Sequence, residues 1–122
     1  MSEGPRLAAL RLSATVRLLC LPLAGVLIAS LFKAAPSIGG IIPSPWDLLA
    51  HLSFYGVIGV LIAIGLRGLP FWLPFLFTCA VGGADEIYQS FLPGRVAGLD
   101  DFSVDVFAAT LATWLVYRFL RR

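Results

Sequence analysis

Four long apolar runs constrain this chain more than any other feature, and they lie near residues 12–33, 48–66, 69–91 and 101–119. Each run comes close to the roughly 20 residues that an α-helix needs to cross about 30 Å of hydrocarbon. A helix satisfies its own backbone hydrogen bonds in lipid, and the connections between the runs contain proline and glycine. The sequence therefore predicts an all-α membrane protein, a bundle of four transmembrane helices.

The composition supports a membrane protein over a soluble one. Of 122 residues, 59% are hydrophobic and 13% are charged, whereas soluble domains average about 45–50% and 25%. A soluble domain of this length could not bury so much apolar surface. Residues 1–122 are therefore expected to form a single membrane domain. The net charge is only +2 and the basic residues are scattered along the chain, which argues against nucleic acid as a partner. The first run could instead be a signal peptide, but it is longer than the apolar core of one.

The distribution of charge predicts the orientation of the four helices. Seven of the nine basic residues fall on the side that holds both termini: Arg6, Arg11, Arg17, Arg67, Arg118, Arg121 and Arg122. Only Lys33 and Arg95 fall on the other side, where six of the seven acids gather. Because cytoplasmic loops carry an excess of Lys and Arg, both termini are expected to be cytoplasmic.

Polar side chains recur at one depth, toward the expected extracytoplasmic side. They are Asp47, His51 and Tyr55 in the second run, Asp85, Glu86 and Gln89 in the third, and Asp101 and Asp105 in the fourth. Residues four apart share a helix face, so His51 is expected beside Asp47 and Asp105 beside Asp101. Acids within a membrane usually face the bundle interior or a water-filled cavity. The pattern predicts one polar site shared by three helices.

Small residues adjoin this level and predict close helix contacts. Ala108, Ala109 and Ala112 follow Asp105, and Gly82 and Gly83 precede Asp85. Small residues let transmembrane helices approach closely. Such contacts would hold the polar side chains in a fixed cluster.

Several of these residues also have a purely structural interpretation. His51 alone could be a core histidine bonded across helices, and Asp47 alone could cap the second helix. Arg95 could clamp the third and fourth helices together or bind an anionic head group. Both readings of Arg95 fit the spacing equally.

The polar segment is similar to a known family. Asp85-Glu86-Ile87-Tyr88-Gln89 is followed by Pro93-Gly94-Arg95 and by Asp101 and Asp105, with Asp47-x-x-x-His51 upstream. This order and spacing resembles the VanZ-like family of small bacterial integral-membrane proteins over residues 46–115. One departure is Ala108, where the family often has glycine.

The resemblance implies a multi-pass protein of the bacterial cytoplasmic (inner) membrane. It also suggests a link to glycopeptide resistance, because the namesake is associated with low-level resistance to teicoplanin. Our first hypothesis is that the site acts on, or binds, an envelope lipid head group or a lipid-linked cell-wall component. The alternative is a non-enzymatic partner that modulates a cell-wall or transport complex, with the polar cluster as a structural clasp. A proton or ion path ranks last, because the polar residues do not continue across the bundle.

The first hypothesis assigns roles to the polar residues. The catalytic candidates are His51, Glu86, Gln89, Asp101 and Asp105, and the ligand-binding candidates are Arg95, Asp47, Asp85 and Tyr55. Glu86 or Asp105 could act as general base, His51 could carry a proton or a metal, and Arg95 could hold a phosphate or carboxylate. Several carboxylates and one histidine could also bind Mg²⁺, Mn²⁺ or Zn²⁺, but their spacing matches no standard metal motif. Cofactor, enzymatic activity and oligomeric state stay open.

Overall fold

The computed structural model describes residues 10–11, 13–38, 45–93 and 98–121, and within them the chain is helical apart from two very short strands. The helices are α1 (Ala14–Ile38), α2 (Trp46–Gly65), α3 (Trp72–Ser90) and α4 (Leu99–Phe119). The strands β1 (Leu10–Arg11) and β2 (Leu120–Arg121) form a parallel pair with Leu10 opposite Leu120. The prediction of an all-helical fold is confirmed.

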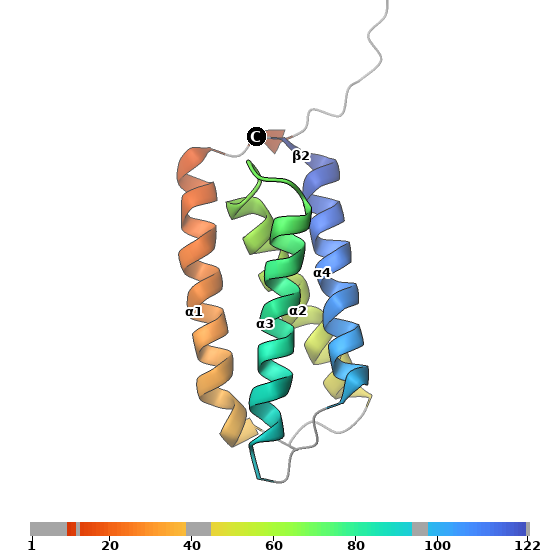
Figure 1. The fold of residues 1–122 in the computed structure, drawn as a ribbon. Coiled ribbons are helices and arrows are strands. Elements are labelled where there is room, and N and C mark those ends of the chain that lie inside the picture. Colours follow the sequence, from red (N-terminus) through yellow and green to blue (C-terminus); the bar gives the residue numbers. More distant parts are fainter. Residues whose placement is uncertain (1–9, 12, 39–44, 94–97, 122) are drawn as a thin grey trace, which may run out of the picture.

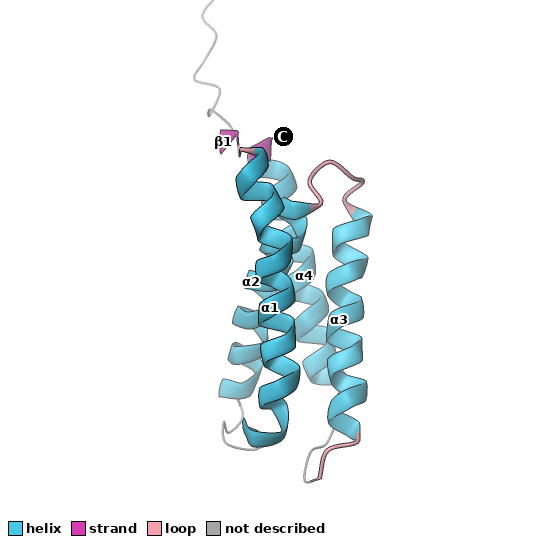
Figure 2. Cartoon of the chain, turned by 90° about the vertical axis from the view of Figure 1, so that its left-hand side faces the viewer, coloured by secondary structure: helices cyan, strands magenta, loops and turns pink. Residues whose placement is uncertain are grey.

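The helices run alternately in opposite directions and lie side by side along their length (Figures 1 and 2). The starts of α2 and α4 and the end of α3 meet at one end of the bundle, which we call the polar end. The α2–α3 turn and the β1–β2 pair lie at the opposite end, which we call the terminal end. Helix α2 contacts all three other helices, most extensively α4.

The outer surface of the bundle is strongly apolar. Large hydrophobic side chains are exposed on every helix, among them Leu18, Leu19, Val26, Leu49, Val57, Leu76, Phe77, Ile87, Phe107 and Trp114. Soluble monomers rarely expose contiguous apolar surface on this scale. Lipid is the environment that such a surface fits.

Three helices within the described residues are long and apolar enough to cross a membrane: Ala14–Pro36, Trp46–Gly65 and Leu99–Phe119. These spans are compatible with the expected multi-pass membrane protein. Helix α3 is not among them, because polar side chains such as Asp85, Glu86 and Gln89 lower its mean hydropathy. The helix that fails as an apolar span is thus the one that contributes most polar groups to the cluster.

Two helix boundaries differ from the sequence-based expectation because of proline. Helix α1 runs to Ile38, beyond the expected end near residue 33, and includes Pro36. Proline removes one backbone donor, and in the last turn that loss does not stop the helix. Helix α3 begins at Trp72, which places Pro74 in its first turn, where the backbone N–H has no helical partner in any case.

Close packing between α2 and α4 rests on small residues, as expected. Ala108, Ala109 and Ala112 are all buried. A Cβ added at Gly59 on α2 would lie 2.9 Å from the Cβ of Ala112. The two helices are therefore too close for any larger side chain at Gly59, and this contact fixes how α2 and α4 meet below the polar end.

Candidate functional site

The polar end of the bundle buries most of the side chains that the sequence singles out. Asp85 and Asp105 are 0% exposed, Glu86 is 8% exposed and Gln89 is 4% exposed. Acids are rarely buried to this degree without a partner, because desolvating a charge is costly. The structure therefore places an acid-rich cluster inside the bundle.

His51 connects α2 to α4 within this cluster. Its Nδ1 lies 3.0 Å from Oδ1 of Asp105, so an Nδ1–H donates to the buried carboxylate. The imidazole also stacks on the ring of Tyr55, with centroids 5.9 Å apart and planes inclined by 17°. These two contacts fix the plane of the ring. His51 is thus bonded across helices, which agrees with the structural interpretation without excluding a functional one.

Two further hydrogen bonds connect α3 to its neighbours. The hydroxyl of Tyr55 donates to Oδ2 of Asp85 over 2.9 Å, which joins α2 to α3. The backbone N–H of Gly98 donates to Oε2 of Glu86 over 3.2 Å, which joins the end of α3 to the start of α4. Each of the two acids is therefore held through one carboxylate oxygen.

The other carboxylate oxygen of each buried acid has no partner. Asp85 Oδ1, Glu86 Oε1 and Asp105 Oδ2 are all buried without a hydrogen bond among the described residues. No Lys or Arg in the described part of the chain pairs with these acids, and the ion pair found there is the one between His51 and Asp105. Among the described residues, the cluster therefore has more acids and acceptors than basic groups and donors. Unsatisfied buried polar groups of this kind are uncommon and often mark functional sites.

Gly82 makes room for Asp105. A Cβ added at Gly82 would lie 3.0 Å from the Cβ of Asp105 and 3.1 Å from its Oδ2. Gly83 is less constrained, because a Cβ there would lie 3.5 Å from the ring of Phe102. The expected close contact between α3 and α4 thus depends on Gly82 more than on Gly83.

The remaining candidate residues lie at the edge of the cluster or outside the residues that the structure describes. Helix α2 begins at Trp46, so Asp47 occupies its first turn and is not the cap, and its Oδ1 accepts a hydrogen bond from the N–H of Leu48 over 2.9 Å. Asp101 is partly exposed in the first turn of α4, and its charge acts on both His51 and Glu86. Arg95 lies outside the described residues.

Two features of the structure were missed in the sequence. The N–H of Gly98 contacts Glu86, and a backbone donor leaves no signal in a side-chain pattern. At the terminal end, Arg67 lies over the ring of Tyr117 at 4.2 Å, and its Nε donates to the carbonyl oxygen of Leu120 over 2.9 Å. In the sequence Arg67 contributed only to the predicted orientation, and its partners lie about 50 residues away.

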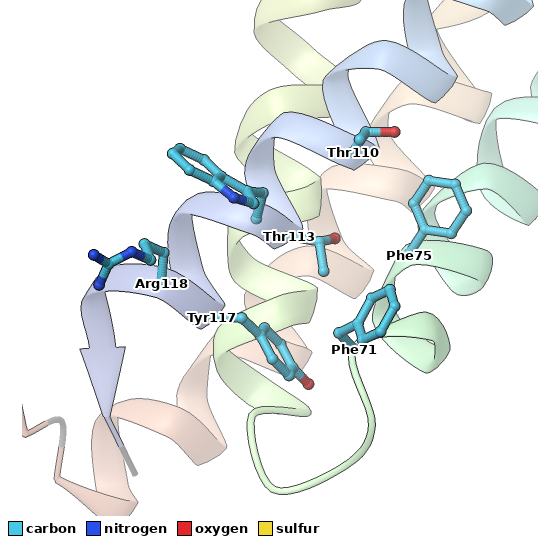
Figure 3. A pocket seen from close by; sticks show the side chains of 7 residues that line it. Phe71, Phe75, Thr110, Thr113, Tyr117 and Arg118 are labelled. Atoms are coloured by element: carbon cyan, nitrogen blue, oxygen red, sulfur yellow. The ribbon is translucent and has the colours of Figure 1, made fainter.

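A separate apolar pocket of about 510 Å³ opens between α3 and α4 near the terminal end (Figure 3). Its lining consists of Phe71, Phe75, Thr110, Thr113, Trp114, Tyr117 and Arg118. The lining includes neither an acid nor a histidine. The pocket therefore offers shape and apolar surface, whereas the groups capable of acid–base chemistry or metal binding lie in the polar cluster.

The arrangement at the polar end has two chemical capacities. A histidine that donates to a buried carboxylate can accept or release a proton at its other nitrogen. Buried carboxylate oxygens without a partner among the described residues can bind a cation or accept hydrogen bonds from a ligand. Comparisons with protein families, curated proteins and solved structures find no match to this chain.

Proposed function

We propose that this chain is a VanZ-like protein of the bacterial cytoplasmic membrane that crosses the bilayer four times. In this proposal both termini are cytoplasmic, and the polar end faces the extracytoplasmic side. The polar cluster binds, or acts on, the head group of an envelope lipid or a lipid-linked cell-wall component. A role in resistance to teicoplanin-type glycopeptides, which bind cell-wall precursors outside the membrane, fits this location.

One observation supports the proposal above the others. Among the described residues, three buried acids each keep an oxygen without a partner, although hydrogen bonds from His51 and Tyr55 on α2 and from the N–H of Gly98 hold their other oxygens in place. A cluster built only to join helices would be expected to satisfy those oxygens, because each unsatisfied buried group costs about 1–3 kcal/mol. A preorganised but incomplete set of polar groups favours binding of a further species.

The residues of the cluster suggest a division of labour. Glu86 has a free oxygen and is the candidate general base, while His51, oriented by Asp105, is the candidate proton carrier. Arg95, close after the end of α3 in the sequence, is proposed to contact an anionic part of the head group. Gln89, which is buried, and Asp101, which is partly exposed, are proposed to contact polar parts of the ligand.

Lipid analysis of the purified protein tests this function. Wild type, Glu86→Gln and the control Asp100→Asn would be extracted from bacterial membranes in a mild detergent, and their co-purified lipids measured by mass spectrometry. Asp100 is exposed at the start of α4, so its variant keeps the cluster intact. We expect an anionic or glycan-linked lipid to be enriched with wild type and with Asp100→Asn but lost from Glu86→Gln. Equal lipid profiles for all three proteins would contradict binding at this site.

The proposed orientation has its own test. After Cys20 and Cys79 are replaced by serine, a cysteine is introduced at exposed Pro93 near the polar end or at exposed Gly68 in the α2–α3 turn. A membrane-impermeant maleimide added to intact spheroplasts should label Pro93→Cys and should label Gly68→Cys only after lysis. The reverse pattern would contradict the orientation.

The clasp is the second candidate, and the helix-to-helix bonds favour it. His51 with Asp105 joins α2 to α4, and Tyr55 with Asp85 joins α2 to α3. In this account the protein is a non-enzymatic membrane partner of a cell-wall or transport complex, and the cluster stabilises the bundle. Variants of the cluster would then lose activity only in proportion to their loss of folded protein.

A further inference from the structure

Three side chains of the polar cluster share one arrangement: each has one polar atom held by a partner and another that is free. Asp85 is held through Oδ2 by the hydroxyl of Tyr55, and Glu86 is held through Oε2 by the N–H of Gly98. Asp85 Oδ1 and Glu86 Oε1 have no partner. His51 is held through Nδ1 by Asp105, and the hydrogen bonds of the described residues do not involve its Nε2.

These three side chains also converge in space. One ligand atom from each of His51, Asp85 and Glu86 lies within 4.8 Å of the other two. Atoms bound to one metal ion at about 2.1 Å lie roughly 3.0–3.5 Å apart, so each would move inward by less than about 1 Å. The two acids are at least nine-tenths buried, at 0% and 8% exposure. The oxygens of these acids that lack a partner among the described residues are therefore shielded from solvent, and the three residues can each bring a ligand atom to one ion.

We propose that His51 Nε2, Asp85 Oδ1 and Glu86 Oε1 form a binding site for one divalent transition-metal ion of the Zn²⁺ and Mn²⁺ class. An imidazole with two carboxylates is a ligand set for such ions, whereas Mg²⁺ and Ca²⁺ prefer oxygen ligands alone. Asp105 and Tyr55 are positioning residues. They orient His51 and Asp85, as carboxylate and hydroxyl partners commonly orient metal ligands.

The ion would also correct the charge of the cluster. Three buried acids face one histidine, and no Lys or Arg of the described residues pairs with them. A divalent cation supplies positive charge that no Lys or Arg of the described residues supplies to these acids, which lowers the cost of burying the carboxylates.

Three protein ligands leave coordination positions open, as in metal sites that bind a water or a substrate. Those positions suit a phosphate oxygen of a lipid head group, so this inference rests on the head-group binding of the proposed function and adds the cation through which the head group is bound. With the ion in place, His51 and Glu86 act as metal ligands and not as proton carrier and general base.

Direct metal binding tests the site. Wild-type protein, stripped with chelator and held in detergent, is titrated by calorimetry with Zn²⁺, Mn²⁺ and Mg²⁺, and the protein as purified is assayed by inductively coupled plasma mass spectrometry. We expect one Zn²⁺ or Mn²⁺ per chain and at least about 100-fold weaker binding of Mg²⁺. No binding of Zn²⁺ or Mn²⁺ to the folded protein would overturn the proposal.

Variants of the proposed ligands and positioning residues distinguish a specific metal site from nonspecific attraction of cations to acidic residues. His51→Gln, Asp85→Asn and Glu86→Gln should each lose at least about 100-fold in affinity, and Tyr55→Phe and Asp105→Asn about 10–100-fold. Asp100→Asn, which removes an acid outside the group, should bind as wild type does. Circular dichroism and monodisperse elution confirm that each variant is folded, and Glu86→Gln, which keeps the shape of the side chain, serves if another variant fails to fold. An equal loss in Asp100→Asn, or no loss in folded Glu86→Gln, would overturn the assignment.

Lipid binding distinguishes failure of this inference from failure of the proposed function. Enrichment of an anionic lipid that survives chelation would overturn the metal bridge and leave the binding function intact. One bound Zn²⁺ or Mn²⁺ without any enriched lipid would support the metal site and contradict the head-group function. Loss of the lipid on chelation and its return with Zn²⁺ or Mn²⁺ would support both.

Discussion

The charged side chains at the two ends of the bundle differ in how far the chain supplies them with partners. At the terminal end, Arg67 donates to the carbonyl oxygens of Leu120 and Tyr117, over 2.9 Å and 3.3 Å, and lies over the ring of Tyr117. At the polar end, three buried acids share one histidine and keep three oxygens without a partner. The charge of Arg67 is matched by backbone carbonyl oxygens, whereas the acids at the polar end have only His51 as a charged partner among the described residues.

This difference separates a structural cluster from a candidate site. At the terminal end, backbone carbonyl oxygens accept the hydrogen bonds of the Arg67 guanidinium, so this contact requires no bound ligand. The acids at the polar end are also held by hydrogen bonds, but among the described residues no Lys or Arg pairs with them. Rigid acceptors without partners favour the binding of a cation or a hydrogen-bond donor. For this reason we attribute the function to the polar end.

The largest effect is expected from overfilling the polar end at Gly82. In Gly82→Val the new Cβ would lie 3.0 Å from the Cβ of Asp105, so α3 and α4 must separate. Overpacking of this kind costs about 2–3 kcal/mol of unfolding free energy. Unfolding in detergent, followed by circular dichroism as SDS is added, measures the loss. Gly56→Val is the control, because nothing lies within 4 Å of a Cβ at Gly56; equal losses in both variants would contradict a specific contact at Gly82.

A smaller but local effect is expected at the terminal end from Arg67→Met. The variant keeps much of the apolar stem but removes the donors to Leu120 and Tyr117, and it should lose about 1.5 kcal/mol of unfolding free energy. Metal and lipid binding at the polar end should not change. Arg118→Met, at an exposed position, is the matched control and should lose less than about 0.5 kcal/mol. A loss of binding in folded Arg67→Met would show that the two ends are not independent.

One hydroxyl at each end gives the most direct comparison. Tyr117→Phe removes a donor to the carbonyl oxygens of Leu66 and Leu69, and Tyr55→Phe removes the donor to Asp85. Each should cost about 1 kcal/mol of unfolding free energy. Only Tyr55→Phe should also weaken metal binding, which calorimetry measures. If both variants bind metal as wild type does, Tyr55 is a structural residue alone.

The smallest change in stability, and the most diagnostic, is expected from Glu86→Gln. The substitution keeps the size of the side chain and removes one of three buried charges, so metal-free protein should be unchanged or slightly more stable, by up to about 1 kcal/mol. Lipid and metal binding should nevertheless be lost. Thermal unfolding of chelated protein measures this. A clear drop in stability of Glu86→Gln would favour the clasp.

Hydropathy and helical spacing predicted most of the architecture. Helical length follows from the thickness of the bilayer, so apolar runs locate helices closely enough to show that Asp105 and His51 lie at one level. Residues four apart on one helix must share a face, which placed Tyr55 in line with His51. The contact of Asp105 with His51 agrees with that prediction.

Other features depended on three-dimensional packing that no local pattern records. The sequence could not reveal which oxygen of Glu86 meets the N–H of Gly98, because every residue except proline carries such a donor. In the sequence Arg67 contributed only to the predicted orientation, because its partner Tyr117 lies on a helix about 50 residues further along the chain. Pro36 indicated a break between helices, yet a proline in the last turn left enough hydrogen bonds for α1 to continue.

The pairing of β1 with β2 also has a consequence for how the protein is made. Leu10 and Leu120 are direct partners although 110 residues separate them, so α1 leaves the ribosome long before the strand that ties its start to the end of α4 exists. During synthesis α1 can pack on α2 but cannot be fastened at the terminal end. Assembly of the terminal end therefore requires the residues after Phe119. A chain stopped before Leu120 would insert its helices, but the strand before α1 would have no partner.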